Sequence, residues 1–107
     1  MSDTELPLPT CLDCGKPAEA PLISTTDVAL LDVRVERLKQ DQKWGDQSEH
    51  SDAIWQAILT EEVGECAQAV LHNGFGGKAA GTLRDELVQV AAVAVAWVEA
   101  IDRRGYK

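Results

Sequence analysis

The stretch that decides the fold is TLRDELVQVAAVAVAWVEAIDR, which occupies residues 82–103. Thr82 with Asp85 three residues later comes close to a capping box, so a helix is expected to start at Thr82. The segment 90–98 is apolar on nearly every side and rich in alanine. This composition predicts burial on several sides, because small residues let neighbouring helices approach closely. We therefore expect a long, central helix that ends at about Arg103.

Two further helices are expected earlier in the chain. A first helix should start after the polar residues 24–27, which supply capping oxygens, and should end near residues 43–45 (KWG). A second helix should start after residue 51 or 52 and run to about residue 72, where Asn73 and Gly74 close it. The first helix carries its apolar side chains three and four residues apart on one face: Val28, Leu31, Val35 and Leu38.

The fold class that follows is all-α, an antiparallel helical bundle. No stretch alternates between apolar and polar residues clearly enough to predict a strand, and residues 74–81 are a glycine-rich connector. A chain of 107 residues is long enough for one domain, but its interior is small. Pairing with a second copy is therefore expected to complete the bundle.

An irregular arm is expected at residues 1–23, before the helical domain at 24–107. All four prolines fall in this arm, which excludes a long helix there: Pro7, Pro9, Pro17 and Pro21. Cys11 and Cys14 have the C-x-x-C-G form of a zinc knuckle. A structural Zn²⁺ site needs four ligands, so the others would come from elsewhere in the chain (His50, His72 or Cys66) or from a second arm. A plain reduced arm is the alternative.

Charge and hydropathy exclude some classes of partner. Acidic residues outnumber basic ones 18 to 10, and the net charge of −8 repels nucleic-acid backbones, so DNA or RNA binding is not expected. No segment has the apolar length of a membrane span, and residues 1–10 (MSDTELPLPT) lack the basic and apolar regions of a signal peptide. The expected location is the cytoplasm, where the three cysteines would stay reduced or bind metal.

Two of the predicted helices place a glutamate in the middle of an apolar face. At about 100° per residue, Glu62 is centred on a face of its helix that holds Trp55, Ile58, Leu59, Cys66 and Ala69. Glu86 is centred on a face that holds Leu83, Val90, Val93 and Trp97. Glu65 and Gln89, each three residues further on, lie at the margins of these faces.

Such carboxylates need compensation, because burying an ionised carboxylate without a partner is costly. Neither face carries a lysine or arginine. A divalent cation such as Mg²⁺ compensates best, since it takes several oxygen ligands from separate elements. The alternatives are protonation of the glutamates, or glutamates at the edge of the bundle that reach water.

These motifs give the chain a specific resemblance. Residues 61–65 (EEVGE) have the form E-E-x-x-E, and Glu86 begins a segment that aligns with the E-x-x-D of the MazG-like, all-α nucleoside triphosphate pyrophosphohydrolases. The apolar tail at 90–100 and residues 42–47 (QKWGDQ) also look like the small members that phages and bacteria encode. The resemblance covers about residues 27–104. It implies Mg²⁺-dependent hydrolysis (Mn²⁺ being an alternative) of a nucleoside triphosphate to a monophosphate and pyrophosphate, in the host cytoplasm if a phage encodes the chain.

The resemblance also implies that the helical subunits assemble as a homodimer or homotetramer, and it implies roles for the site residues. Glu62, Glu65 and Glu86 would be metal ligands. Glu61 would be a further ligand or a base that orients the attacking water, and Glu62 would also take part in catalysis. Side chains that could contact the nucleotide are Trp44, by stacking, and Lys43, Lys78 and Arg84, by phosphate contacts. The alternative for Trp44 is a packing role. The alternative for each of the three cations is a solvated position on the surface.

One position departs from the family pattern: Gln89 stands where the family has its last acid. An amide oxygen can ligate Mg²⁺, but it does so weakly and without charge. This departure keeps two other functions open. The chain could be a weakened enzyme that binds or sequesters nucleotides, or a helical interaction module without enzymatic activity.

Overall fold

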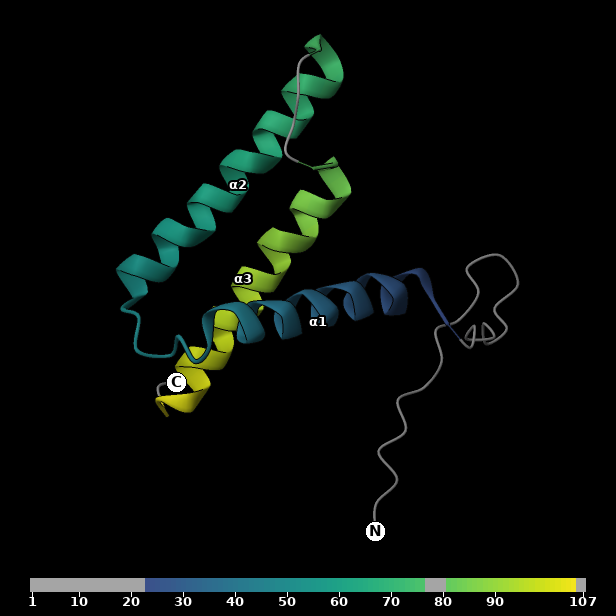
Figure 1. The fold of residues 1–107 in the computed structure, drawn as a ribbon. Helices are drawn as coiled ribbons and strands as arrows, with labels where there is room; N and C mark the ends of the chain where they lie inside the picture. Colours follow the sequence, from purple (N-terminus) through teal and green to yellow (C-terminus); the bar gives the residue numbers. More distant parts are fainter. Residues whose placement is uncertain (1–22, 77–80, 106–107) are drawn as a thin grey trace, which may run out of the picture.

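The computed structural model describes residues 23–76 and 81–105. Three α-helices follow one another: α1 at Thr25–Trp44, α2 at Asp52–Phe75 and α3 at Leu83–Arg103 (Figure 1). The described part of the chain contains no strand, so the all-α prediction is confirmed for it. Cys11, Cys14 and Lys78, three of the predicted site residues, lie outside the described residues.

Side-chain caps start all three helices. Ser24 and Asp27 form a complete capping box on α1, in which each side chain accepts a hydrogen bond from the other residue's backbone N–H. The Ser51 hydroxyl oxygen accepts from the N–H of Ile54 at the start of α2. At the start of α3, the Thr82 hydroxyl oxygen accepts from the N–H of Asp85. The predicted starts of α2 and α3 are therefore correct, whereas α1 starts at Thr25, about three residues before the predicted start, because Ser24 is its N-cap.

The predicted end of α2 is wrong by about three residues. The helix continues through Asn73 and Gly74 to Phe75, and its cap is Gly76, whose φ is 85°. A left-handed backbone of this kind is readily adopted only by glycine, and Gly74 stays within the helix with no positive φ. At the end of α1, Gly45 has a φ of 71° and caps the helix where the sequence predicts.

The central helix is α3. It packs on both of the other helices, whereas α1 and α2 do not contact each other within the described residues. Figure 1 shows α2 and α3 side by side and antiparallel, with α1 crossing α3 near its C-terminal half. The position of α1 relative to α2 is therefore fixed only through α3.

The core is small and lies mainly between α2 and α3. Its buried cluster consists of Trp55, Val93, Ala96 and Ala100, against which Ile58, Leu59 and Trp97 pack. The alanines of α3 face the neighbouring helices, as its composition predicts, because they permit close approach of the backbones. On its outer side, however, Val95 and Val98 are 40% and 57% exposed, so the described chain alone does not bury α3 all round.

The apolar face predicted for α1 does not pack on α3. Val28, Leu31, Val35 and Leu38 are between 42% and 58% exposed. The buried residues of α1 are instead Val33 and Arg37, which lie on the other side of the helix. The local pattern of α1 thus marks an apolar surface that the described part of this chain leaves uncovered.

No helix in the described part of the chain combines the length and the apolar character needed to cross a lipid bilayer.

Candidate metal centre

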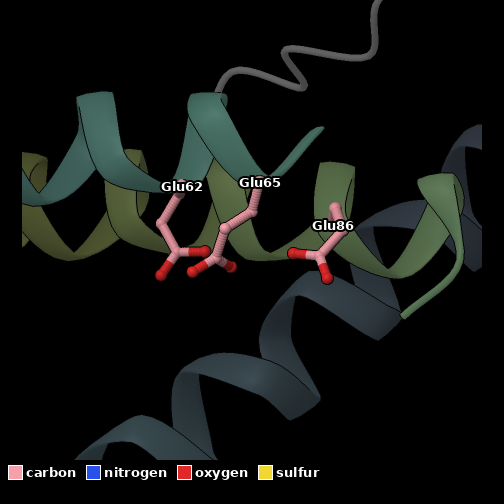
Figure 2. A group of neighbouring side chains, drawn as sticks. All are labelled: Glu62, Glu65 and Glu86. Atoms are coloured by element: carbon pink, nitrogen blue, oxygen red, sulfur yellow. The ribbon is translucent and has the colours of Figure 1, made fainter. Parts of the chain in front are cut away.

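Three carboxylates from two helices meet beside the core. Glu62 and Glu65 come from α2 and Glu86 from α3, and each offers an oxygen atom within 4.8 Å of those of the other two. Figure 2 shows the three side chains leaving the helices in the same direction, with their carboxylates side by side. The two glutamates that the sequence centres on apolar faces therefore converge at one place.

Helical spacing explains how the cluster forms. Glu62 and Glu65 are three residues apart and so project from one side of α2. Glu86 lies in the first turn of α3, where the helix dipole favours a negative charge. Because α2 and α3 are antiparallel and joined by a short connection, the C-terminal half of α2 lies beside the first turns of α3.

The environment disfavours the ionised form of Glu62. Burial is the first cause, and the charge of Glu65, a hydrogen bond with Glu65 and the charges of Glu86 and Glu61 add to it. Together they raise the pKa of Glu62 from its ordinary value of 4.5 to about 7. The Glu62 Oε2 atom is buried and has no hydrogen-bond partner. A buried oxygen of this kind requires a ligand or a proton to compensate for lost hydration.

Glu86 has a similar environment. It is only 7% exposed, and its pKa is raised by burial, by a hydrogen bond with Glu65 and by the charges of Glu65 and Asp85. Within residues 23–76 and 81–105, no lysine, arginine or histidine forms an ion pair with Glu62, Glu65 or Glu86. The negative charge of the cluster is therefore not balanced by protein groups in this part of the chain.

The residues present fit a hard divalent cation. Mg²⁺ prefers carboxylate oxygens and keeps several coordination positions for water or phosphate oxygens. Three converging carboxylates, one of them with an orphaned oxygen, provide the protein part of such a coordination shell. Bound phosphate oxygens would supply the remaining ligands in a kinase- or phosphatase-like manner.

Glu61 and Gln89 lie outside this group of three. Glu61 is exposed, and its charge contributes to the raised pKa of Glu62. Gln89 is half-buried and lines a cavity of about 360 Å³ between α1 and α3. Its neighbours there come from both helices: Asp32, Val35, Glu36, Lys39, Arg84, Asp85 and Val88. The first turns of α3 thus serve two adjacent features, with Glu86 in the cluster and Gln89 in the cavity.

The predicted nucleotide-contacting residues are spread over the molecule. Arg84 lines the cavity, and its guanidinium donates a hydrogen bond of 2.8 Å to the Asp32 carboxylate. Trp44 ends α1 and is 58% exposed, with the Lys43 ammonium 4.7 Å from the centre of its ring. The structure therefore groups Arg84 with the cavity and Lys43 with Trp44, at different ends of α1.

Two residues near these features were not predicted to belong to the magnesium or nucleotide site, although Cys66 was considered as a zinc ligand. Lys39 is a cation in the wall of the cavity, one helical turn from Val35 on α1. The thiol of Cys66 lies close enough to the cluster for Glu86, Glu62 and Glu65 to raise its pKa, although burial is the larger cause. The position of Cys66, four residues after Glu62 on the same helical face, was the available signal.

No protein-family model, curated protein or solved structure matches this chain. The functional argument therefore depends on the geometry and chemistry of the cluster.

Proposed function

We propose that this protein is a Mg²⁺-dependent nucleoside triphosphate pyrophosphohydrolase. The observation that carries the proposal is the cluster of Glu62, Glu65 and Glu86, whose charge no described cation balances and in which Glu62 Oε2 lacks a partner. A triphosphate needs its negative charge neutralised before water can attack it. A carboxylate cluster that binds Mg²⁺ supplies that neutralisation. The substrates of the enzyme would be cytoplasmic nucleotides, which themselves carry Mg²⁺.

The chain's own residues would divide the remaining work. Mg²⁺, when bound, polarises the phosphoryl oxygens and offsets the charge that builds up as the anhydride bond breaks. Glu62, Glu65 and Glu86 hold it, and Glu61 orients a water molecule and accepts its proton. The water oxygen forms the new bond to phosphorus, the anhydride P–O bond breaks, and the products are a nucleoside monophosphate and pyrophosphate.

The cavity between α1 and α3 is the proposed position of the substrate's polar groups. It adjoins the cluster through the first turns of α3 and contains two cations, Lys39 and Arg84. Three carboxylates in its wall (Asp32, Glu36 and Asp85) would repel an uncompensated phosphate, so Mg²⁺ must accompany the nucleotide. Trp44 and Lys43 are not part of this position, because the end of α1 lies beside Arg103 at the far end of α3.

Gln89 favours a second candidate, a protein that binds and sequesters nucleotides with little turnover. An amide in the cavity wall can accept and donate hydrogen bonds but adds no charge for a further metal ion. Tight nucleotide binding without release of pyrophosphate would support this candidate. Activity that appears or increases in Gln89→Asp would support it further.

We also propose that a second copy covers the exposed face of α1 and completes the helical bundle. The four apolar side chains of that face lie on one side of α1, and several valines of α2 and α3 are about half exposed as well. Leu31→Glu, in the middle of the face, should shift the protein toward monomer in light scattering after size-exclusion chromatography. Wild-type protein that is already monomeric at high concentration would contradict the assembly and favour α1 as a surface for another partner.

The activity is tested by measuring pyrophosphate release from each common ribo- and deoxyribonucleoside triphosphate with Mg²⁺, with Mn²⁺ and with chelator. We expect release with either metal, none with chelator, and a loss of at least about 100-fold in Glu62→Gln and Glu86→Gln. Glu49→Gln, which changes an exposed glutamate in the loop before α2, is the matched control. Intact substrates under every condition would reject the enzyme.

A further inference from the structure

Gly81 lies against one of the three clustered carboxylates. A Cβ atom built on Gly81 would be 3.1 Å from Glu86 Oε1, and 3.7 Å and 3.9 Å from two atoms of the Asp85 side chain. A separation of 3.1 Å is tighter than nine in ten Cβ contacts in proteins, so the neighbouring carboxylate would have to move by a few tenths of an ångström. The space beside Glu86 therefore depends on residue 81 having no side chain.

Gly81 differs in this respect from the other described glycines. Gly45, Gly76 and Gly105 have positive φ angles, so their backbone conformation explains the residue type. Gly64 and Gly74 have no positive φ, and a methyl group added at either would meet no atom within 4 Å. Gly81 has an ordinary φ and a crowded Cβ position. Space beside the carboxylate, and not backbone freedom, is what glycine provides there.

The residue that follows Gly81 is held to the first turn of α3 by two hydrogen bonds. The hydroxyl oxygen of Thr82 accepts a 3.1 Å hydrogen bond from the Asp85 N–H, and the Thr82 carbonyl accepts a 3.0 Å bond from the Glu86 N–H. These bonds fix Thr82, and with it one end of the Gly81 backbone, relative to the first turn of α3. The Glu86 carboxylate, 7% exposed, is the group that a methyl at position 81 would displace.

We propose that Gly81 is a positioning residue for the metal centre, which sets where Glu86 Oε1 lies. The inference rests on the proposed metal site and adds to it a determinant of which cation the site prefers. Mg²⁺ requires nearly ideal octahedral geometry with oxygen distances of about 2.0–2.1 Å, whereas Ca²⁺ accepts about 2.3–2.6 Å and irregular geometry. A carboxylate moved by a few tenths of an ångström should therefore weaken Mg²⁺ binding more than Ca²⁺ binding.

The test measures the affinities of wild type and Gly81→Ala for Mg²⁺ and for Ca²⁺, by calorimetry and by the shift in Tm. Gly74→Ala is the control, since its new methyl meets nothing and its helical site accepts alanine. For Gly81→Ala we expect Mg²⁺ affinity to fall about tenfold or more, as for other supporting residues of metal sites, and Ca²⁺ affinity to fall much less. A general loss of stability would not change the ratio of the two affinities.

A second variant tests whether the effect passes through Glu86. Glu86→Asp shortens the side chain and removes the crowded oxygen from Gly81, so adding Gly81→Ala to it should cost no further Mg²⁺ affinity. If Gly81→Ala fails to fold, as judged by circular dichroism, the double variant should fold again. A double variant that also fails to fold would show that the methyl clashes elsewhere and would overturn the proposal.

The possible outcomes separate this inference from the proposed function. Wild-type protein whose Tm and calorimetric signal respond to neither cation would reject the metal centre itself and, with it, the role of Gly81. Wild-type protein that binds Mg²⁺ while Gly81→Ala keeps the wild-type ratio of Mg²⁺ to Ca²⁺ affinity would reject only the role of Gly81.

Discussion

Arg37 of α1 and Glu99 of α3, which are 62 residues apart in the sequence, form a two-point ion pair. The Arg37 Nη2 atom lies 2.7 Å from Glu99 Oε1, and Nε lies 3.4 Å from Oε2. The Arg37 side chain is 10% exposed and also donates hydrogen bonds to Asp41 and Gln40. The bond to Glu99 is the main reason that the pKa of Arg37 is raised. This ion pair replaces an apolar contact where α1 crosses α3.

Replacing Arg37 should therefore destabilise the fold. We expect Arg37→Ala to lower the free energy of unfolding by about 2–3 kcal/mol, at the lower end for a broken buried ion pair because Glu99 can partly reach water. Arg37→Lys, which keeps the charge but loses the two-point geometry, should lose less. Arg34→Ala changes an exposed arginine of the same helix and is the control in urea unfolding. Equal losses in Arg37→Ala and Arg34→Ala would contradict the structural role of the pair.

The metal-free protein should become less stable as the pH rises from about 4.5 to about 7. The folded state raises the pKa of Glu62 from 4.5 to about 7, so in this range it binds more protons than the unfolded state does. Its contribution is fully present below pH 4.5 and is lost as the pH passes through 7. We expect a loss of about 1 kcal/mol, because water screens the half-exposed group, or roughly 4–8 °C in Tm for a small domain. A Tm in chelator that rises over this range would contradict the assignment.

Neutralising the cluster by mutation should stabilise the metal-free protein and abolish its response to Mg²⁺. Glu62→Gln and Glu86→Gln each remove a charge that neighbouring carboxylates and burial disfavour. Each variant should gain about 1 kcal/mol of stability in chelator near pH 7, and excess Mg²⁺ should no longer raise its Tm. The control Glu49→Gln should behave as the wild type under both conditions. Variants that keep the full stabilisation by Mg²⁺ would place the metal elsewhere.

Cys66 should report metal binding through its thiol pKa. Burial and the charges of Glu86, Glu62 and Glu65 raise that pKa. Bound Mg²⁺ offsets the three charges, so the thiol pKa should fall when Mg²⁺ binds. The thiol pKa is measured from the pH dependence of the reaction with a disulfide reagent. The variant Cys11→Ser/Cys14→Ser is used, because Cys66 is then the one remaining cysteine. Adding Glu62→Gln and Glu86→Gln to this variant should lower the thiol pKa in the absence of metal. An unchanged thiol pKa would show that the carboxylates of the cluster do not influence Cys66.

The sequence predicts the parts of this structure that depend on local spacing. Caps at Ser24, Ser51 and Thr82 require only residues within one turn, and the sequence identifies the starts of α2 and α3 and the segment that caps α1. The meeting of Glu62 with Glu86 follows from similar logic. Each glutamate is centred on an apolar face, and two helices joined by a short connection pack those faces together.

The features that the sequence does not predict depend on contacts between distant residues. The apolar spacing of α1 points to the Val28–Leu38 face, yet α1 meets α3 through Val33 and Arg37. That choice depends on Glu99, which lies far along the chain and has no spacing relationship with Arg37. The end of α2 was also ambiguous, because Gly74 and Gly76 are both possible caps and only the backbone angle of Gly76 decides between them.

Because the backbone of α1 approaches α3 and not α2 within the described residues, one wall of the cavity belongs to α1 alone, whereas the other wall shares α3 with Glu86 of the acidic cluster. Substitutions that tilt α1 on its ion pair would widen or narrow the cavity while Glu62, Glu65 and Glu86 keep their places on the other helix pair. Such an arrangement allows the selectivity for the molecule in the cavity to change during evolution while the chemistry of the carboxylates is preserved. Variation along the cavity-facing side of α1 is therefore where related chains should diverge first.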